Sequence, residues 1–481
     1  MAKEFIVAIE LGSSKMTGIA GRKNPDGSMT ILAVAKEDST SYIRKGVVYN
    51  IDKTAQGLSN IISKLKNNLQ TDITQVYVGI GGQSIHSVKN TVIKDLPIDA
   101  IVSQDMVDEL MDNNRNMGYP EYDIQNAITQ EYKVDSQYQD DPVGIQAKRL
   151  EGNYLNILWR RSFYRNLNKS IENAGLTIAE VYLAPLVMAD NVLTEAEKRA
   201  GCVLVDLGAE TTTVSVYYRN KLRNIAVIPL GSNNVTRDLE SLQLENHEAE
   251  TLKLKYGSAY TDTESIDPNG TINIDSTRTI KKTEFIEVVE ARMLEIIENV
   301  KTLIPAEYSA KLLGGFVLTG GGSNMTNIDV AFHKFIGAEK VRIAKAPLIN
   351  INSKDSVQPV EEDGTMCTIL SLMAKGNMNC AGRDLNQTLF GEELDNHADT
   401  VTTTTTGAES LRKAEEERKR QQEEEARRAE EERARLQREQ EEAEEAKRLK
   451  EQRKKNSWLG RLTTSITNFG KSLVEPDTDN N

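Results

Sequence analysis

The sequence predicts an α/β protein that is built from two similar lobes and is followed by a charged segment and a short amphipathic one. A strand, a glycine-rich turn and a second strand occur twice, at residues 5–20 and 203–217. Two such copies, separated by about half of the globular length, indicate a duplicated architecture. From Ala408 to Asn456 nearly every residue is Glu, Arg, Lys, Gln or Ala, so the globular part is expected to end near residue 390.

The composition argues against several classes of protein. The chain of 481 residues is long enough for two or more domains with sizeable cores. Its net charge of −13 argues against nucleic acid as a partner, because a broad nucleic-acid surface needs clustered positive charge. No apolar run of about 18 residues could span a membrane, and the first residues are too poor in apolar side chains for a signal peptide. The cysteines Cys202, Cys367 and Cys380 lack disulfide or zinc spacing and fit partly buried thiols in a reducing cytosol.

The first copy of the repeat contains a turn suited to phosphate. Gly12, Ser13, Ser14 and Lys15 lie between its two strands. Glycine and hydroxyl residues let backbone N–H groups point into such a turn, and the lysine adds a positive charge. Glu10 stands two positions before the glycine, where a carboxylate suits a hydrated Mg²⁺, held directly or through water.

The second copy repeats this arrangement. Its turn runs from Gly208 to Thr213, and Asp206 stands two positions before the glycine. Two turns that face each other could clamp a polyphosphate between the lobes. A third glycine run, at 320–322, follows a strand and would let the chain pass close to a flat ring such as adenine. The P-loop and Rossmann spacings are both absent, so the prediction depends on the three turns occurring in this order.

The segments between the turns supply the rest of the two lobes. Residues 161–198 read as helical with a break at Pro185, and residues 283–303 carry apolar side chains at helical spacing. Residues 76–82, VYVGIGG, alternate as a strand does. The four histidines are scattered, so a structural role is favoured for each and no catalytic residue is predicted.

With these turns in order, the chain resembles the FtsA family, the bacterial cell-division branch of the actin/Hsp70/sugar-kinase superfamily. The three turns are similar to the superfamily's two phosphate motifs and its adenosine motif. The likeness to FtsA in particular lies in VGIGGQSIHS at 78–87, PLGSNNVTRDLESLQLENHEAETLKLKYG at 229–257, GGGSNMTNI at 320–328 and VRIAKAP at 341–347. It covers about residues 4–390 and the C-terminus, and it implies a duplicated actin-like ATPase fold with two lobes and an inserted subdomain 1C.

The resemblance also implies how the chain divides into subdomains. Subdomain 1A would comprise residues 1–83, 161–200 and 376–399, with the SHS2-like subdomain 1C inserted at 84–160. Subdomain 2A would comprise residues 201–233 and 314–375, with subdomain 2B at 234–313. A charged helical linker at 400–456, a membrane-targeting amphipathic helix at 457–474 and a disordered tip at 475–481 would follow.

The matching positions imply a site for ATP and Mg²⁺. The nucleotide-binding residues would be Gly12, Ser13, Ser14, Lys15, Asp206, Gly208, Thr211, Glu250, Lys253, Gly320, Gly321 and Gly322. Glu10 and Asp206 would hold the metal, and Glu250 and Lys253 would lie near the ribose. The chain departs from the family at Glu10, usually Asp, at Ser13, usually Thr, and at Ser232, usually Gly. ATP binding should survive these changes, and hydrolysis is expected to be slow at most.

The charged linker has the features of a solvated helix. Residues 408–455 contain sixteen Glu and sixteen Lys or Arg. Pairs such as Glu415–Lys419 and Glu444–Arg448 are spaced to contribute about 0.2–0.5 kcal/mol each to a helix. No a/d heptad persists, so a single stiff helical arm is favoured over a coiled coil, with a flexible linker as the alternative.

The terminal segment, SWLGRLTTSITNFGKSLV, is amphipathic. One helical face would carry Trp458, Leu459, Leu462, Ile466, Phe469 and Leu473. The segment is too short and too polar to span a bilayer, but it can lie on the surface of one that contains anionic lipid. A helix that docks back on the globular part is the alternative, although FtsA-like proteins bind the membrane through a terminal helix of this kind.

By resemblance, the chain is expected to bind ATP, to self-assemble into actin-like filaments and to anchor FtsZ filaments to the cell membrane. It would lie on the cytoplasmic side as a peripheral protein at the division septum. The C-terminal tail of FtsZ would meet subdomain 2B, where Arg292 matches a basic position, and other division proteins would be further partners. Two alternatives stay open: a sugar-kinase-like phosphotransferase of the same superfamily, and a pilus-type actin-like adaptor that needs no membrane helix.

Overall fold

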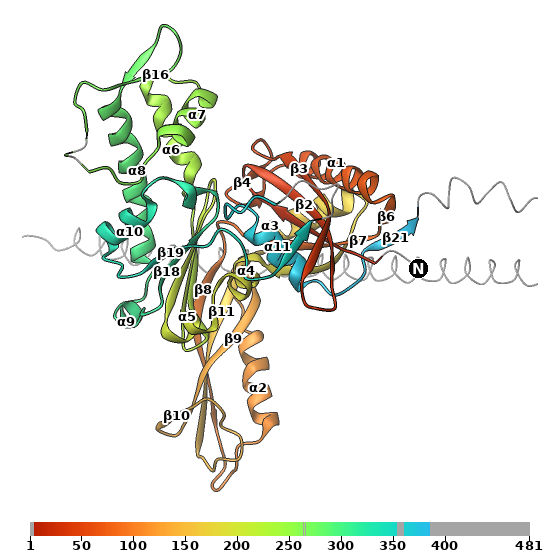
Figure 1. Cartoon of the computed structure of the whole chain (residues 1–481). Helices are drawn as coiled ribbons and strands as arrows, with labels where there is room; N and C mark the ends of the chain where they lie inside the picture. The colour runs from red at the N-terminus through yellow and green to blue at the C-terminus, as the bar shows by residue number, and fades with distance from the viewer. Residues whose placement is uncertain (1–3, 263, 265, 354–359, 385–481) are drawn as a thin grey trace, which may run out of the picture. The chain divides into compact units, whose positions relative to one another are not determined.

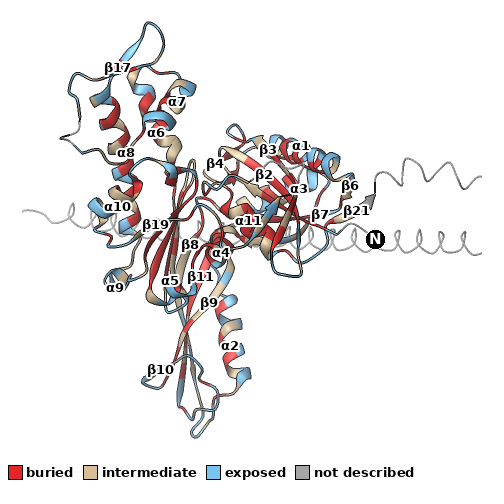
Figure 2. Ribbon diagram, viewed as in Figure 1, coloured by how far each residue is buried: buried red, intermediate tan, exposed pale blue. Residues whose placement is uncertain are grey.

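The computed structural model describes residues 4–262, 264, 266–353 and 360–384, which all belong to one compact unit, Met1–Glu393. The predicted linker, amphipathic helix and tip, at 400–456, 457–474 and 475–481, lie outside the described residues. Two large sheets organise the described part (Figure 1). Buried residues gather in the strands of these sheets and in the helices that pack on them (Figure 2). In this part of the chain, no helix is both long and apolar enough to cross a membrane.

Lobe 1 is built on a six-stranded sheet in the order β12-β7-β1-β2-β3-β20. Its strands are β1 (Ile6–Leu11), β2 (Lys15–Lys23), β3 (Met29–Asp38), β7 (Gln75–Ile80), β12 (Thr177–Leu183) and β20 (Ile351–Ser353). Its helices are α1 (Ile51–Leu69), α3 (Arg161–Asn173), α4 (Ala184–Val192) and α11 (Cys367–Lys375). A short helix, α5 (Glu195–Ala200), follows α4 and packs on the sheet of lobe 2. Two further strand pairs complete it, β4 (Ile43–Arg44) with β5 (Val47–Val48), and β6 (Thr71–Ile73) with β21 (Ala381–Asp384).

Lobe 2 is built on one end of a nine-stranded sheet whose full order is β10-β9-β11-β8-β15-β14-β13-β18-β19. Its strands are β13 (Cys202–Leu207), β14 (Thr212–Tyr218), β15 (Lys221–Ile228), β18 (Gly315–Thr319) and β19 (Val341–Ile343). Its helices are α6 (Ser232–Leu239), η1 (Glu240–Leu242), α7 (Asn246–Tyr256), α8 (Lys282–Thr302), α9 (Ala306–Ser309), η3 (Gly321–Asn324) and α10 (Ile328–Ile336). A small hairpin, β16 (Thr271–Asn273) with β17 (Thr279–Lys281), precedes α8.

The two lobes repeat the same strand arrangement, which confirms the predicted duplication. In lobe 1, β1 pairs antiparallel with β2 and parallel with β7. In lobe 2, β13 pairs antiparallel with β14 and parallel with β18. The register places Glu10 opposite Thr17 and Asp206 opposite Thr213, so the two predicted metal carboxylates occupy equivalent positions of their hairpins.

The remaining strands of the large sheet belong to an insert that interrupts lobe 1 in the sequence, between β7 and α3. The insert contains β8 (His86–Asp95), α2 (Gln104–Arg115), β9 (Tyr122–Val134), β10 (Gln137–Gln139) and β11 (Arg149–Arg160). It has a separate small core that includes Leu110, Leu150 and Tyr154. A single register pair, Ala226 with His86, joins its sheet to β15 of lobe 2.

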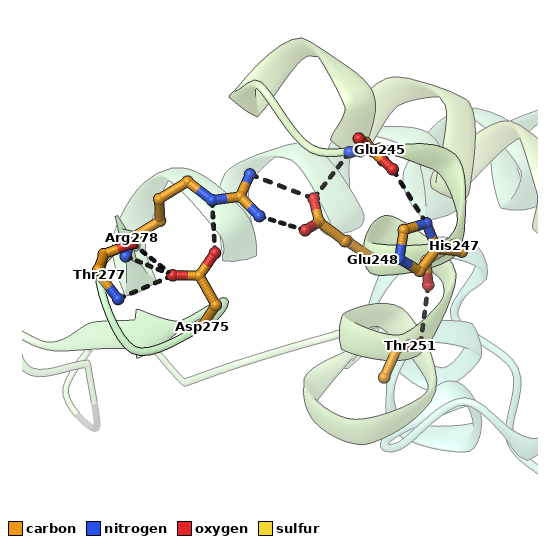
Figure 3. A network of polar contacts seen from close by, with 7 residues as sticks. All are labelled: Glu245, His247, Glu248, Thr251, Asp275, Thr277 and Arg278. Atoms are coloured by element: carbon orange, nitrogen blue, oxygen red, sulfur yellow. Dashed lines mark hydrogen bonds and ion pairs between the residues drawn. The ribbon is translucent and has the colours of Figure 1, made fainter.

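A polar network ties the β16–β17 hairpin to α7 (Figure 3). The guanidinium of Arg278 pairs with the carboxylate of Glu248 on α7 and with that of Asp275 in the hairpin turn. Asp275 also accepts from the backbone N–H groups of Thr277 and Arg278, at 2.8 Å and 2.9 Å. These hydrogen bonds hold the pKa of Asp275 far below its ordinary value.

Two expectations about the elements need correction. The segment 161–198 is not helical throughout, because β12 runs between α3 and α4 and pairs parallel with β7. Pro185 does not break a helix either. It lies in the first turn of α4, where the missing N–H costs nothing because that group has no partner within a helix.

Candidate nucleotide-binding site

A cavity of about 630 Å³ is lined by residues of both lobes. All of the residues predicted to bind nucleotide or metal lie on its wall, namely Glu10, Gly12, Ser13, Ser14, Lys15, Asp206, Gly208, Thr211, Glu250, Lys253, Gly320, Gly321 and Gly322. These residues come from three turns, from strands that flank them and from one helix, which are far apart in the sequence. The duplicated hairpins therefore bring both predicted phosphate turns to one cavity.

The first turn joins β1 to β2 and is held from behind by a second turn of lobe 1. A Cβ on Gly12 would stand 2.5 Å from the carbonyl oxygen of Lys15, so only glycine fits there. The backbone N–H of Gly46 donates to Ser13 Oγ at 2.8 Å, and Ser39 Oγ donates to the carbonyl of Gly12 at 2.6 Å. The Ser13 hydroxyl thus anchors the turn as well as lining the cavity.

The second turn joins β13 to β14 and is bonded to the start of α6. The N–H of Gly208 donates to the carbonyl of Thr211 at 2.9 Å, which closes the turn. The N–H of Ser232 then donates to the carbonyl of Gly208 at 2.9 Å, and that of Asn233 to Ala209 at 2.7 Å. Ser232 and Asn233 line the cavity themselves, so the first turn of α6 is part of the site.

The third turn follows β18 and passes directly over Asp206. Gly320 has φ 82 and ψ 168, a conformation that is essentially restricted to glycine. A Cβ at this position would overlap Asp206 Oδ1 and the backbone of Leu207. This close approach fixes the glycine run against β13 and brings the third turn to the same cavity as the two phosphate turns.

The carboxyl groups of Glu10 and Asp206, which line the cavity, both have raised pKa values. Burial, together with the charge of Asp206, raises the pKa of Glu10 to about 8, against smaller opposing effects of Lys15 and of a hydrogen bond with Thr368. Burial also raises the pKa of Asp206 to about 6. Two carboxylates that disfavour each other's charge are a suitable pair for a divalent cation, because the cation stabilises both charged forms.

The donor set fits Mg²⁺ better than a metal that is caged by protein ligands. Among the described residues, no group of three or more His, Cys, Asp or Glu side chains could hold a metal ion. Mg²⁺ commonly uses one or two carboxylates and takes its other ligands from water and substrate phosphates. Glu10 and Asp206 beside two phosphate turns match that preference.

Glu250 and Lys253, both on α7, are paired with each other across the cavity wall. Lys253 Nζ donates to Glu250 Oε2 at 2.7 Å, to Thr236 Oγ1 at 2.9 Å and to the carbonyl of Ser232 at 3.3 Å. The lysine side chain is buried, and its charge is compensated by Glu250. The pair therefore holds α7 against α6 in addition to lining the cavity.

Several residues on the cavity wall were not predicted. Gly46, Gly81 and Gly82 lie beside the first phosphate turn, and the segment 363–365 lies beside the third. The pair Gly81-Gly82 ends the predicted strand at 76–82, and Asp363-Gly364-Thr365 has the composition of a turn. Both are visible as turn signals, but their place at this cavity depends on contacts between distant segments.

A second cavity, of about 420 Å³, lies between α6 and α8. It is lined by Arg237, Asp238, Ser241, Val288, Ala291, Arg292 and Glu295. Arg292, the predicted partner-binding residue, is on its wall. Its guanidinium donates to both oxygens of Asp238, at 2.5 Å and 3.0 Å, and also pairs with Glu295. A partner carboxylate would have to compete with Asp238 and Glu295 for Arg292. Arg237, which is more exposed, was not predicted as a partner-binding residue.

The six predicted membrane-binding residues, Trp458, Leu459, Leu462, Ile466, Phe469 and Leu473, lie outside the described residues. Their role stays a prediction.

Comparison with known proteins gives matches across most of the described chain. The family described as "Cell division protein FtsA" matches residues 203–359, and the one described as "SHS2 domain inserted in FTSA" matches residues 82–158. The chain is 32% identical to the cell division protein FtsA of Porphyromonas gingivalis over 364 residues, which cover 74% of this chain and 75% of that protein. It is 28% identical to FtsA of Bacillus subtilis, over 72% of this chain and 80% of that protein.

A solved structure supports the fold. The PilM-PilN type IV pilus biogenesis complex contains a chain that is 14% identical, with a TM-score of 0.53, and the match covers 76% of this chain and 97% of that one. At this identity the likeness concerns the fold alone.

Proposed function

Because the chain belongs to the family of the cell division protein FtsA, we propose that it is an actin-like cell-division protein that binds ATP with Mg²⁺ and tethers FtsZ filaments to the membrane. The observation that carries the proposal is the convergence of three glycine turns on one cavity. The turns are separated by roughly a hundred residues or more, so their meeting is a property of the fold.

The cavity offers each part of the nucleotide a suitable surface. The turns at Gly12 and Gly208 supply backbone N–H groups and hydroxyls for phosphate, and Lys15 adds a positive charge. The glycines at 320–322 leave room for a flat base. Glu10 and Asp206 would hold Mg²⁺, which neutralises phosphate charge when it is bound. No pairing of a nucleophile with a base is proposed, and hydrolysis is expected to be slow at most.

The second cavity is the proposed site for the C-terminal tail of FtsZ. Its two arginines, Arg237 and Arg292, would contact acidic groups of the tail, and Val288 with Ala291 offers an apolar surface between them. This refines the earlier prediction for Arg292, because Arg237 presents the more exposed guanidinium.

The proposed tether is the segment 457–474, which lies outside the described residues. Its amphipathic pattern supports attachment to the cytoplasmic face of the cell membrane at the septum. One such helix would bind weakly, and self-assembly of the actin-like part into filaments would strengthen attachment through avidity.

The decisive experiment is sedimentation with anionic liposomes, with and without ATP and Mg²⁺, for the full chain and for a variant that lacks residues 457–481. The full chain should sediment with the liposomes, more so with ATP, and the truncated variant should stay in the supernatant. Unchanged liposome binding by the truncated variant would exclude the tether. A phosphotransferase would instead show steady ATP turnover that does not depend on residues 457–481. A pilus-type adaptor, which needs no membrane helix, would not sediment with the liposomes.

A further inference from the structure

One short helix connects the two cavities. The first turn of α6, at Ser232 and Asn233, lines the nucleotide cavity, and its last turn, at Arg237 and Asp238, lines the second cavity. The start of the helix is bonded to the second phosphate turn through the N–H groups of both residues. A change at one end of α6 therefore has a direct physical route to the other cavity.

A second connection runs through Glu210, which lies within the second phosphate turn. Its carboxylate pairs with the guanidinium of Arg237 from the second cavity. The Glu210 side chain is only 12% exposed, whereas that of Arg237 is 53% exposed. The arginine is thus accessible to a ligand, and the carboxylate that depends on it is not.

The other oxygen of Glu210 reaches lobe 1. Glu210 Oε2 accepts from the backbone N–H of Lys45 at 2.8 Å. The neighbouring N–H of Gly46 donates to Ser13 Oγ in the first phosphate turn. Glu210 is thus a residue of the second phosphate turn, and its carboxylate contacts the segment at Lys45 and Gly46 that supports the first phosphate turn. The charge of this carboxylate is compensated by Arg237 of the second cavity.

We infer that Glu210 and α6 couple the two cavities, so that an acidic peptide in the second cavity weakens nucleotide binding in the first. The inference rests on the proposed function, which supplies the two ligands. A peptide carboxylate and Glu210 compete for the same guanidinium of Arg237. When Arg237 turns to the peptide, the largely buried charge of Glu210 is left uncompensated beside a turn that must hold phosphate. Coupling is reciprocal, so nucleotide weakens peptide binding by the same factor.

The first test needs no peptide. Binding of N-methylanthraniloyl-ATP with Mg²⁺ is measured by fluorescence titration for the full chain, for Arg237→Gln and for Glu210→Gln/Arg237→Gln. We expect Arg237→Gln to raise the Kd about fivefold, although Arg237 does not line the nucleotide cavity, and the double variant to return to within about twofold of the unchanged chain. Equal Kd values for the unchanged chain and Arg237→Gln, or no recovery in the double variant, would overturn the inference.

The second test adds a synthetic peptide of the FtsZ C-terminal tail at saturating concentration. The peptide should raise the nucleotide Kd about fivefold in the unchanged chain and less than about twofold in Glu210→Gln. The same shift in both proteins would overturn the inference.

A matched control is available in the same lobe. Glu248 pairs with Arg278 in a similar setting (Figure 3), at 15% and 46% exposed. Neither residue lines either of the two cavities described above. Glu248→Gln should keep the full peptide effect. If it loses the effect as Glu210→Gln does, general loosening of the lobe explains the result and the inference is wrong.

Failure of the proposed function gives different results. If the unchanged chain binds no nucleotide, the nucleotide site is wrong. If it binds nucleotide but no peptide, the proposed partner is wrong, and the comparison of Arg237→Gln with the double variant still decides the coupling. If Arg237→Gln does not fold, Arg237→Lys replaces it. This variant keeps the charge and should bind nucleotide with the Kd of the unchanged chain. The effect of the peptide on the nucleotide Kd of Glu210→Gln then decides whether the two cavities are coupled.

Discussion

Gly320 shows how a single residue can fix the geometry of the proposed nucleotide cavity. Its backbone conformation is essentially restricted to glycine, and its missing Cβ leaves the space that Asp206 Oδ1 occupies. A side chain at this position would have to move either the third turn or a proposed metal ligand. Gly337 also has a positive φ, of 78°, but nothing lies within 4 Å of an added Cβ there.

The pair of glycines gives a prediction for substitution by alanine. Gly320→Ala should weaken nucleotide binding about tenfold or more, because strain of about 1–3 kcal/mol falls on the site itself. Gly337→Ala should lose some stability through its positive φ but should keep its nucleotide affinity. Fluorescence titration with a nucleotide analogue and thermal unfolding measure the two effects, and equal affinities of both variants would contradict the role given to Gly320.

Glu10 gives a prediction about pH. The folded state raises its pKa from 4.5 to about 8, so the folded state binds the proton more tightly than the unfolded state does. The free energy of unfolding of the nucleotide-free and metal-free protein should therefore fall as pH rises from about 4.5 to about 8 and level off above that range. Glu10→Gln cannot ionise and should reduce this slope. Urea denaturation at a series of pH values measures it, and identical slopes for both proteins would refute the prediction.

Among the elements, α8 shows how well a hydrophobic pattern predicts the bounds and the buried face of a helix. The predicted helix at 283–303 is observed at Lys282–Thr302. Of the seven apolar residues at helical spacing that predict it, Val288 is half-buried and the other six are buried, namely Phe285, Val289, Met293, Ile296, Ile297 and Val300. The pattern could also predict the two hairpins, because each turn is encoded within a few residues. It missed β12, although Gly175 after α3 has a positive φ and a β-rich run follows it. The pairing of β12 with β7, about a hundred residues earlier in the chain, is set by the fold and not by the local pattern.

Two neighbouring residues of α8 test its packing. Met293 is 2% exposed and Leu294 is 37% exposed. Met293→Ala should lower the free energy of unfolding by about 2–5 kcal/mol through the cavity it leaves, whereas Leu294→Ala should change it by about 0.5 kcal/mol or less. Chemical denaturation followed by circular dichroism compares them, and similar losses in the two variants would mean that α8 packs on a different face.

At the scale of the whole molecule, the order of the motifs predicted which turns meet at the first cavity, whereas the ion pair between Glu210 and Arg237 was not predictable. Glycine turns carry a signal in their own composition, and the duplication places them opposite each other. Glu210 and Arg237 carry no such signal, because a single Glu and a single Arg are common surface residues until the fold pairs them. Arg292 is the one residue lining the second cavity that was predicted from the sequence as partner-binding, and that prediction was made by resemblance.

Ligand binding across both lobes should stabilise the whole described unit. ATP with Mg²⁺ at about a hundred times its Kd should raise the free energy of unfolding by about 2.7 kcal/mol, because the unfolded chain has no site. EDTA should remove most of this gain if Glu10 and Asp206 hold the metal. Thermal unfolding with ATP, with ATP and Mg²⁺, and with ATP and EDTA makes the comparison. An unchanged melting temperature at saturating ATP and Mg²⁺ would contradict a nucleotide site in this cavity.

All three cysteines of the chain are buried in the described structure, which has a practical consequence for labelling chemistry. Burial raises the pKa of Cys202 to about 12 and that of Cys367 to about 11, and it also raises that of Cys380. Thiolates are the species that react with maleimides, so the native thiols should stay unmodified near neutral pH. Cysteines introduced by substitution can then be labelled without first removing the native ones. Spin labels at the exposed positions Ser63 on α1 and Ser276 in the β16–β17 hairpin, through Ser63→Cys and Ser276→Cys, would report the distance between the two lobes directly.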